Sequence, residues 1–210
     1  MRKNLVLAIV LLSLLAGAQL VSSERVEAAC QEFDNDTLQY YKADMATTFK
    51  AGTICFYDNN KFVSLGTLRT NTTLHYKADG LTTFMGGKEV RFGPEGYVFA
   101  GVLYNNTTLY YKPEGSAIFM GGQAARFGAK GFIESGTLYS STKLYYKADS
   151  YAVFAGGQAI FFRPLDAVRG GGFVTNGVLA TDTTLYYAPG QSRTYQGGSR
   201  VSFCQEGWAN

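Results

Sequence analysis

Few residues in this chain have the types and spacing that catalysis needs. The chain has one histidine, His75, so no second imidazole is available to share a metal ion. No nucleophile-elbow pattern accompanies it, and the Gly-Gly pairs lack the Lys-Ser/Thr and the helix of a phosphate loop. We therefore expect no catalytic residue, no metal site and no cofactor, and we predict that the protein is not an enzyme.

Four acidic residues each follow a lysine by two positions, within short turns: Asp44, Asp79, Glu114 and Asp149. A calcium site needs several oxygen ligands, whereas each of these turns offers one carboxylate. Aspartate is also favoured in turns, because its side chain bonds the local backbone. We favour this turn role over a row of ligand contacts.

Paired tyrosines are the strongest indication of function. They occur as Tyr40-Tyr41, Tyr110-Tyr111, Tyr145-Tyr146 and Tyr186-Tyr187, and His75 takes the first place in a fifth pair. Successive residues of a strand face opposite sides, so one ring of each pair packs in a core while the other is exposed. The sequence predicts an exposed ladder of tyrosines with lysines beside it: Tyr40, Tyr110, Tyr145 and Tyr186, with Lys42, Lys112 and Lys147.

Tyrosine suits binding surfaces, since it combines a large apolar ring with a hydroxyl. We expect this ladder to bind a glycan or a cell-surface protein. The alternative is cross-strand aromatic pairing that only stabilises a sheet.

These residues belong to a repeat with a period of 35 positions, as from Leu74 to Leu109. Five copies are visible, approximately 31–65, 66–100, 101–135, 136–176 and 177–210, with six extra residues inside Arg163 to Gly172. The recurring landmarks include Phe49, Phe84, Phe119, Phe154 and Tyr195, then Gly66, Gly101, Gly136 and Gly177, then Tyr57, Phe92, Phe127, Phe162 and Phe203. A period of this length indicates a solenoid, a propeller or another array.

Each copy contains about four short β-rich segments separated by turn residues. We expect one hairpin around Asn105-Asn106, and further turns at Lys112–Gly115, Gly121-Gly122 and Gly128–Gly131. In the strand that contains Tyr97 to Leu103, both faces carry large apolar residues, which predicts cover on both sides. Gly101 lies mid-strand and indicates a bulge or a close backbone approach.

The fold class that follows is all-β: five repeats of short antiparallel strands in an open solenoid or a curved meander sheet. A five-bladed β-propeller is the alternative. Trp208 falls at the repeat position of Tyr97, and Cys30 at that of Ala100, so the two ends together complete one repeat. A closed propeller has this phase, and an open array also permits it.

Two segments resemble MORN-type repeats, which are Gly- and Tyr-rich hairpins. They are Phe119-Met120-Gly121-Gly122 and Gly131-Phe132-Ile133-Glu134-Ser135-Gly136, with their counterparts in other copies. The resemblance covers about half of each repeat and implies hairpins. The 35-residue period and the Leu-Tyr-Tyr-Lys run depart from that family's pattern.

Residues 1–29 predict a secretory signal peptide, and residues 30–210 a single β-repeat domain. Arg2 and Lys3 precede an apolar run from Leu5 to Leu15, and small residues follow. The run is too short for a membrane span. We expect a secreted protein, extracellular, periplasmic or at the cell surface, in which two of Cys30, Cys55 and Cys204 form a disulfide.

Scattered basic residues do not indicate nucleic acid. A second class of function stays open beside the binding module. Exposed strand edges of an open array can pair with another copy, which would give a structural, self-assembling extracellular protein.

Overall fold

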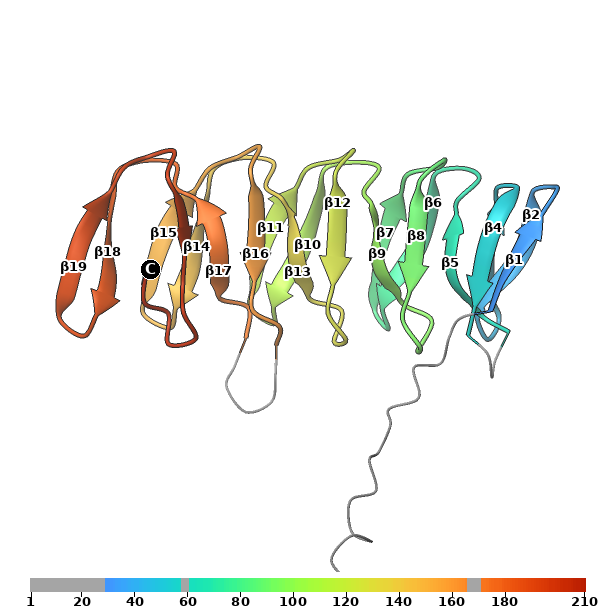
Figure 1. Ribbon diagram of the computed structural model, residues 1–210, viewed down its shortest axis with the longest axis horizontal. Coiled ribbons are helices and arrows are strands. Elements are labelled where there is room, and N and C mark those ends of the chain that lie inside the picture. Colours follow the sequence, from blue (N-terminus) through green and yellow to red (C-terminus); the bar gives the residue numbers. More distant parts are fainter. Residues whose placement is uncertain (1–28, 58–60, 166–170) are drawn as a thin grey trace, which may run out of the picture.

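The computed structural model describes residues 29–57, 61–165 and 171–210, and every regular element among them is a β-strand (Figure 1). Ten strands form one antiparallel sheet in the order β1-β4-β5-β8-β9-β12-β13-β16-β17-β20. Their bounds are β1 (Ala29–Phe33), β4 (Gly52–Phe56), β5 (Val63–Thr67), β8 (Glu89–Phe92), β9 (Val98–Val102), β12 (Ala124–Phe127), β13 (Ile133–Thr137), β16 (Ala159–Phe162), β17 (Val174–Val178) and β20 (Arg200–Ser202). The predicted all-β fold is confirmed.

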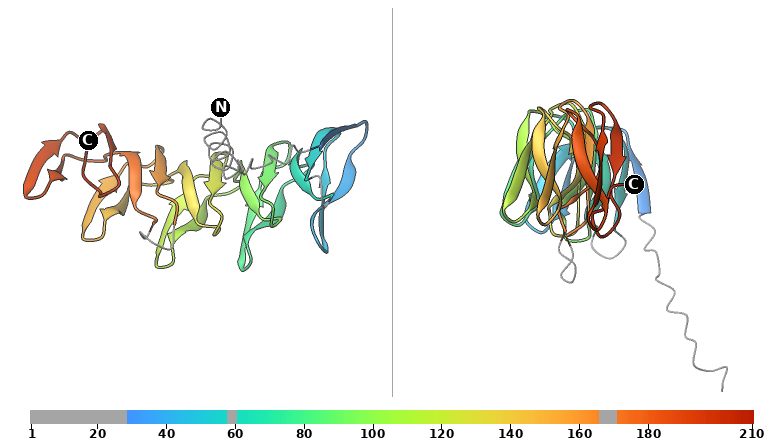
Figure 2. Two further views of the ribbon diagram at one scale, coloured as in Figure 1. Left: turned by 60° about the horizontal axis from the view of Figure 1, so that its bottom comes forward. Right: turned by 90° about the vertical axis from the view of Figure 1, so that its left-hand side faces the viewer.

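The other ten strands form five two-stranded hairpins. They are β2 (Thr37–Lys42) with β3 (Met45–Phe49), β6 (Thr72–Lys77) with β7 (Gly80–Phe84), β10 (Thr107–Lys112) with β11 (Gly115–Phe119), β14 (Thr142–Lys147) with β15 (Ser150–Phe154), and β18 (Thr183–Ala188) with β19 (Gln191–Tyr195). Along the chain, one hairpin alternates with two strands of the large sheet. Figures 1 and 2 show the hairpins as a second layer beside that sheet.

The array is open, as the meander prediction requires. Strands β1 and β20 lie at opposite ends of the ten-stranded sheet, where β1 pairs with β4 and β20 with β17 (Figure 1). The five-bladed propeller alternative is therefore wrong. The complementary phase of Cys30 and Trp208 reflects where each end stops along a repeat, and not a closure between them.

The core lies between the two layers and is built from the recurring aromatic positions. Phe84 of β7 is 1% exposed and packs over the backbone at Gly101 of β9. A Cβ on Gly101 would lie 2.7 Å from Phe84 Cδ1, which is too close for any side chain. The predicted close backbone approach at Gly101 is confirmed, and it is the reason that glycine recurs there.

Each of the first four hairpins also contacts the sheet of the following repeat through its second tyrosine. Tyr76 of β6 stacks on Phe127 of β12 with ring centroids 4.8 Å apart. The same contact recurs as Tyr41 on Phe92, Tyr111 on Phe162 and Tyr146 on Phe203. Stacked rings of this kind add stability beyond their buried area, so these pairs hold successive repeats together.

The hairpin predicted around Asn105-Asn106 is wrong. Strands β9 and β10 do not pair, and the segment between them carries the chain from the large sheet to the hairpin layer. Asn106 supports this crossover, because its Oδ1 accepts a hydrogen bond from Gly121 N at 2.8 Å. Two polar residues between β-rich segments are typical of a hairpin turn and of this crossover alike.

The return crossover explains the Gly-Gly pairs. Gly87 has φ +70°, a conformation that glycine adopts without strain. A Cβ on Gly86 would lie 2.5 Å from the carbonyl carbon of Thr70, so the two crossovers of one repeat touch. Asn71 ties them together by accepting from Gly86 N at 2.8 Å.

Strand β9 is covered on one side only, contrary to the prediction of cover on both. Val98 and Leu103 are buried, whereas Phe99 and Val102 are half-exposed on the outer side of the sheet. The register shifts between the Arg91 and Phe92 pairs, so a bulge near Phe99 inverts the alternation along the strand.

The first repeat departs from the predicted alignment by one residue. Phe56 pairs with Val63 as Phe92 pairs with Val98, so Phe56 and not Tyr57 is the structural equivalent of Phe92. The turn after it is one residue longer, which restores the 35-residue period. The segment from Phe49 to Phe56 is therefore one residue shorter than its counterpart from Phe84 to Phe92.

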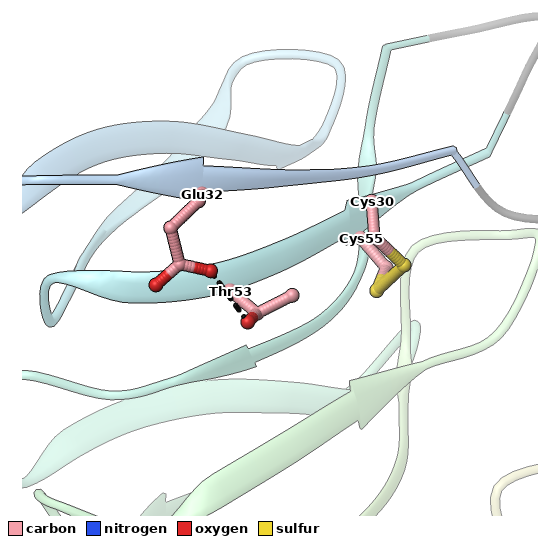
Figure 3. The surroundings of a disulfide bond; sticks show 4 residues. All are labelled: Cys30, Glu32, Thr53 and Cys55. Carbon is pink, nitrogen blue, oxygen red and sulfur yellow. Dashed lines mark hydrogen bonds between the residues drawn. A yellow bond between two sulfur atoms is a disulfide. The ribbon is translucent and has the colours of Figure 1, made fainter.

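A disulfide joins Cys30 of β1 to Cys55 of β4, two residues that lie directly opposite each other (Figure 3). Two residues along the same pair of strands, Thr53 Oγ1 donates a hydrogen bond to Glu32 Oε2 at 2.7 Å. The edge strand at this end of the sheet is thus held covalently. Cys204 is the free cysteine, and its thiol donates to Glu206 at 3.1 Å.

The predicted signal peptide lies outside the described residues, apart from Ala29, and so does most of the insertion within Arg163 to Gly172. Within the part of the chain that is described, there is no helix that could span a membrane.

Candidate binding face

The tyrosines predicted to be exposed share one surface, the outward side of the five hairpins, which we call the outer hairpin face. Alternation along β10 buries Leu109 and Tyr111 against the sheet and turns Thr108 and Tyr110 outward. Tyr40, Tyr110 and Tyr186 are 52%, 42% and 46% exposed. Tyr145 and His75 are half-exposed at the equivalent places. The predicted division into a buried and an exposed ring is confirmed for Tyr40-Tyr41, Tyr110-Tyr111 and Tyr145-Tyr146. It is wrong for Tyr186-Tyr187, where both rings are exposed.

Strand pairing gives each of these residues an outward-facing partner on the same hairpin. Tyr110 lies opposite Ser116, and Tyr145 opposite Tyr151. The full row consists of Tyr40, His75, Tyr110, Tyr145 and Tyr186, opposite Ala46, Leu81, Ser116, Tyr151 and Ser192. We call this the aromatic row.

A second row lies two residues away along the same strands and carries hydroxyls and aliphatic groups. It consists of Leu38, Thr73, Thr108, Lys143 and Thr184, opposite Thr48, Thr83, Ile118, Val153 and Thr194. Thr73 and Thr83 share a hydrogen bond of 2.9 Å between their hydroxyls, and Thr184 and Thr194 share one of 3.0 Å. We call this the hydroxyl row.

Two more tyrosines extend the face beside the hydroxyl row. The N–H of Tyr104 donates to the carbonyl of Thr83, and that of Tyr139 donates to the carbonyl of Ile118. Both follow a buried leucine and so point outward, 43% and 50% exposed. Five residues of this face were not predicted from the sequence: Tyr104, Tyr139, Tyr151, Leu81 and Ile118. Period-2 alternation through the second strand of each hairpin was the signal that could have found the last three.

The exposed apolar side chains of the described chain gather on this face. Of the eleven large hydrophobic residues that are exposed, all but Phe161 and Tyr187 lie on it. They are Leu38, Tyr40, Leu81, Tyr104, Tyr110, Ile118, Tyr139, Tyr151 and Tyr186. Scattered exposed apolar residues are ordinary, whereas their concentration on one face marks an interaction surface.

The face is nearly neutral. The residues of its two rows include one lysine, Lys143, one histidine and no aspartate or glutamate. Its aromatic character is densest in the fourth hairpin. There, Tyr145 and Tyr151 meet edge to face at 5.9 Å, and Lys143 Nζ lies 3.4 Å from the centroid of the Tyr151 ring.

The lysines predicted beside the tyrosines make contacts between repeats. Lys112 Nζ lies 4.9 Å from the Tyr145 centroid and 5.4 Å from that of Phe173. Lys147 Nζ lies 3.8 Å from the Trp208 centroid, and Lys42 Nζ 3.8 Å from that of Tyr97. Their stems pack over glycines of the next sheet turn, as Lys42 does over Gly96. The structure therefore brings Lys112 to the edge of the aromatic row, and it places Lys147 in the packing between repeats.

Burial raises the pKa of Tyr41, Tyr76 and Tyr111 above the usual tyrosine value, since a buried phenolate lacks the hydration that stabilises it in water. These rings stay neutral in the core. In the second hairpin turn, Lys77 lies 3.1 Å from Asp79, and its hydrogen bond lowers the pKa of that carboxyl.

His75 lies on the aromatic row opposite Leu81, as a variant of the tyrosine slot. Among the described residues, no group of three His, Cys, Asp or Glu side chains could hold a metal ion.

Comparison with protein-family models, with curated proteins and with solved structures gives no match to this chain. The outer hairpin face is therefore interpreted from its own geometry.

Proposed function

We propose that this protein is a secreted, non-enzymatic binding protein that holds an extended, neutral glycan against the outer hairpin face. One observation supports this above all: among the described residues, nine of the eleven exposed large hydrophobic side chains lie on that face. Apolar surface of this extent is costly to leave in water, so a ligand that covers it gains affinity.

The chemistry of the two rows favours sugars over other ligands. Tyrosine rings offer flat apolar surfaces against the faces of sugar rings, and their hydroxyls offer hydrogen bonds. The threonines of the hydroxyl row add hydrogen-bond donors and acceptors on the same face. The rows carry no carboxylate and one lysine, so neither a strongly basic nor a strongly acidic ligand is favoured.

The repeat itself favours a long ligand. Equivalent positions recur once per hairpin, so Tyr40, Tyr110, Tyr145 and Tyr186 offer similar contacts along the array. Several weak contacts to one chain combine into a much tighter interaction, because each contact after the first is intramolecular.

The experiment is retention of the purified protein on insoluble polysaccharides such as cellulose, chitin, starch and β-glucan. The test variant is Tyr110→Ala, Tyr145→Ala and Tyr186→Ala together. Three lost rings at about 0.5–1.5 kcal/mol each predict a loss of affinity of roughly tenfold or more. The matched control is Phe161→Ala with Tyr187→Ala, which removes the two exposed rings that lie elsewhere and should leave retention unchanged.

Equal loss in the control variant would show that exposed rings in general, and not this face, cause retention. Retention on none of the polysaccharides, with capture of a protein from a cell-surface extract instead, would replace the glycan with a protein partner. Release of soluble sugars from a retained polysaccharide would contradict the non-enzymatic part of the proposal. Sequencing the N-terminus of the protein recovered from the medium of producing cells tests export.

The second candidate, self-assembly through the ends of the array, is disfavoured by the residues at those ends. Gln31 of β1 pairs with Ile54 as Gly66 pairs with Val90, so it occupies the glycine position over which a phenylalanine packs in other repeats. A preceding hairpin stacked there in the same way would meet the Gln31 side chain. Light scattering across a range of concentrations tests this, and growth into fibres would favour the structural role.

A further inference from the structure

The described parts of the turns that follow β4, β8, β12, β16 and β20 lie in a row at one edge, below the strands in Figure 1. Their first residues are defined by one recurring hydrogen bond, from the N–H of that residue to the carbonyl that closes the turn. These residues are Tyr57, Gly93, Gly128, Arg163 and Cys204. Equivalent places thus carry two large side chains, two glycines and a cysteine.

The two large side chains span the space to the next turn. The hydroxyl of Tyr57 donates to the carbonyl of Phe92 at 2.7 Å. The guanidinium of Arg163 donates to the carbonyl of Cys204 at 2.8 Å and also to that of Gln205. Between the first and second turns, and between the fourth and fifth, a side chain therefore covers the gap.

Glycine leaves the two middle gaps open. Between the second and third turns lies a hollow of about 390 Å³, lined by Tyr76, by residues 93–95 and 97–99, and by Gly128 and Ala129. We call it the turn pocket. The equivalent hollow after Gly128 is smaller, about 180 Å³, because Glu134 lies where a Cβ on Gly128 would be. The turn pocket is within the size range of small-molecule sites.

The lining of the turn pocket is mainly apolar, with three aromatic rings and one carboxylate. Tyr76, Tyr97 and Phe99 contribute rings, and Glu95 contributes the acceptor. Two of these rings already make cation–π contacts within the protein. Lys42 Nζ lies 3.8 Å from the Tyr97 centroid, and the Arg126 guanidinium lies 4.6 Å from that of Phe99. Lys42 disfavours a cationic ligand at Tyr97, and Glu95 disfavours an anionic one. The combination suits a neutral, ring-shaped group that has hydroxyls to donate.

We propose that the turn pocket binds one neutral sugar ring, at an end or branch of the glycan, and that the residue at position 93 decides whether this site is open. The class of ligand rests on the proposed function, whereas the open pocket is a separate feature that lies at the turns of the large sheet and not on the outer hairpin face. The closed gaps at Tyr57 and Arg163 are natural examples of the same site filled by a side chain.

The test fills the pocket with the side chain that closes it in the first repeat. Gly93→Tyr should fold normally, because tyrosine occupies the equivalent place at position 57 and Gly93 does not have a positive φ. Gly93→Ala is the matched control: its Cβ would have only Tyr97 O within 4 Å, at 3.8 Å, so the pocket stays open. Equal thermal unfolding midpoints for the two variants and the unchanged protein establish the fold.

Binding is measured by amide chemical shifts during titration with glucose, galactose, mannose and N-acetylglucosamine at millimolar concentrations. We expect at least one sugar to shift the amides of Tyr97, Val98 and Phe99 in the unchanged protein and in Gly93→Ala. In Gly93→Tyr the affinity should fall by at least tenfold. The proposal is overturned if none of the four sugars shifts these amides, or if Gly93→Tyr binds as well as Gly93→Ala.

The variant that lacks Tyr110, Tyr145 and Tyr186 separates this proposal from the proposed function. It should keep the monosaccharide shifts at Tyr97 to Phe99 while it loses retention on polysaccharide. Monosaccharide shifts in a protein that no polysaccharide retains would leave the turn pocket standing and the outer hairpin face without a ligand.

Discussion

The third and fifth hairpins begin with nearly the same strand, TTLYYK in β10 and TTLYYA in β18, yet their second tyrosines differ completely in burial. Tyr111 is 5% exposed and stacks on Phe162, with centroids 4.8 Å apart. Tyr187 is 42% exposed, and no phenylalanine of a following repeat covers it in the described chain. The burial of this ring is thus decided by the neighbouring repeat and not by the strand that carries it.

Sequence changes in the fifth repeat match this difference. Ala188 stands where Lys112 reaches over rings of the next repeat. Arg193 lies opposite Leu185, at the place where the third hairpin has the buried Ala117 opposite Leu109. The Arg193 guanidinium lies 4.5 Å from the Tyr195 centroid and 5.9 Å from that of Tyr187. A charged side chain thus lies here against rings whose counterparts in the third repeat, Tyr111 and Phe119, are buried.

Tyrosine truncation tests the comparison most strongly. Tyr111→Ala removes a buried, stacked ring and should lower the free energy of unfolding by about 3–5 kcal/mol. Tyr187→Ala removes an exposed ring and should cost less than about 1 kcal/mol. Urea denaturation followed by circular dichroism measures both. Similar losses would mean that Tyr187 is buried in solution by a contact that the described chain does not show.

The disulfide at the other end should have the next largest effect. The Cys30–Cys55 bond closes a loop with a sequence separation of 25, for which chain entropy predicts about 3 kcal/mol of local stabilisation. Reduction should therefore increase amide hydrogen exchange in β1 and β4 and leave β16 and β17 unchanged. Cys204→Ser serves as the control and should alter neither region, and uniform loss of protection along the array would contradict a local role.

Lysine substitution should have a smaller effect. Lys112→Ala loses contacts with the Tyr145 and Phe173 rings and should cost about 1 kcal/mol. Ala188→Lys is the reverse change at the matched position. In the described chain no ring of a following repeat lies beside position 188, so this variant should leave the urea midpoint unchanged. A gain from Ala188→Lys equal to the loss from Lys112→Ala would show that the lysine acts within its own hairpin.

Changes at the two ends should affect stability least and association most. Arg193→Ala with Gln31→Gly restores interior residue types at exposed places, so we expect a stability change within about 0.5 kcal/mol. The variant should associate as its concentration rises, whereas the unchanged protein should stay monomeric in light scattering. A monomeric double variant would show that other features also prevent stacking.

Much of the fold could be predicted because the repeat makes each signal visible several times. Recurrence of Leu74, Tyr76 and Phe84 at fixed intervals identified the core positions, and all three are buried. Prediction failed where one pattern serves two geometries. Asn105-Asn106 has the residues of a hairpin turn but joins two layers. Leu103 before it forms a β-bridge with Phe84 of the preceding hairpin, whereas β10 after it pairs with β11.

Part of the candidate site could be predicted for the same reason. Alternation through Tyr110 and Tyr111 identified the exposed ring. The contribution of Tyr104 depends on its backbone bond to Thr83 of the preceding repeat, which no local pattern encodes. The turn pocket was missed because a glycine in a turn is ordinary, and its meaning appears only beside Tyr57 and Arg163.

By itself, the sequence determined the all-β class, the five-fold repeat and, in the first four repeats, which ring of each tyrosine pair faces the core, because these depend on periodicity along one chain. Only the tertiary structure decided that the array is open, that strands alternate between two layers, and that nine exposed apolar residues share one face. These properties depend on contacts between residues in different repeats. Because the repeats are so similar, the sequence offers several partners for each segment, and packing selects among them.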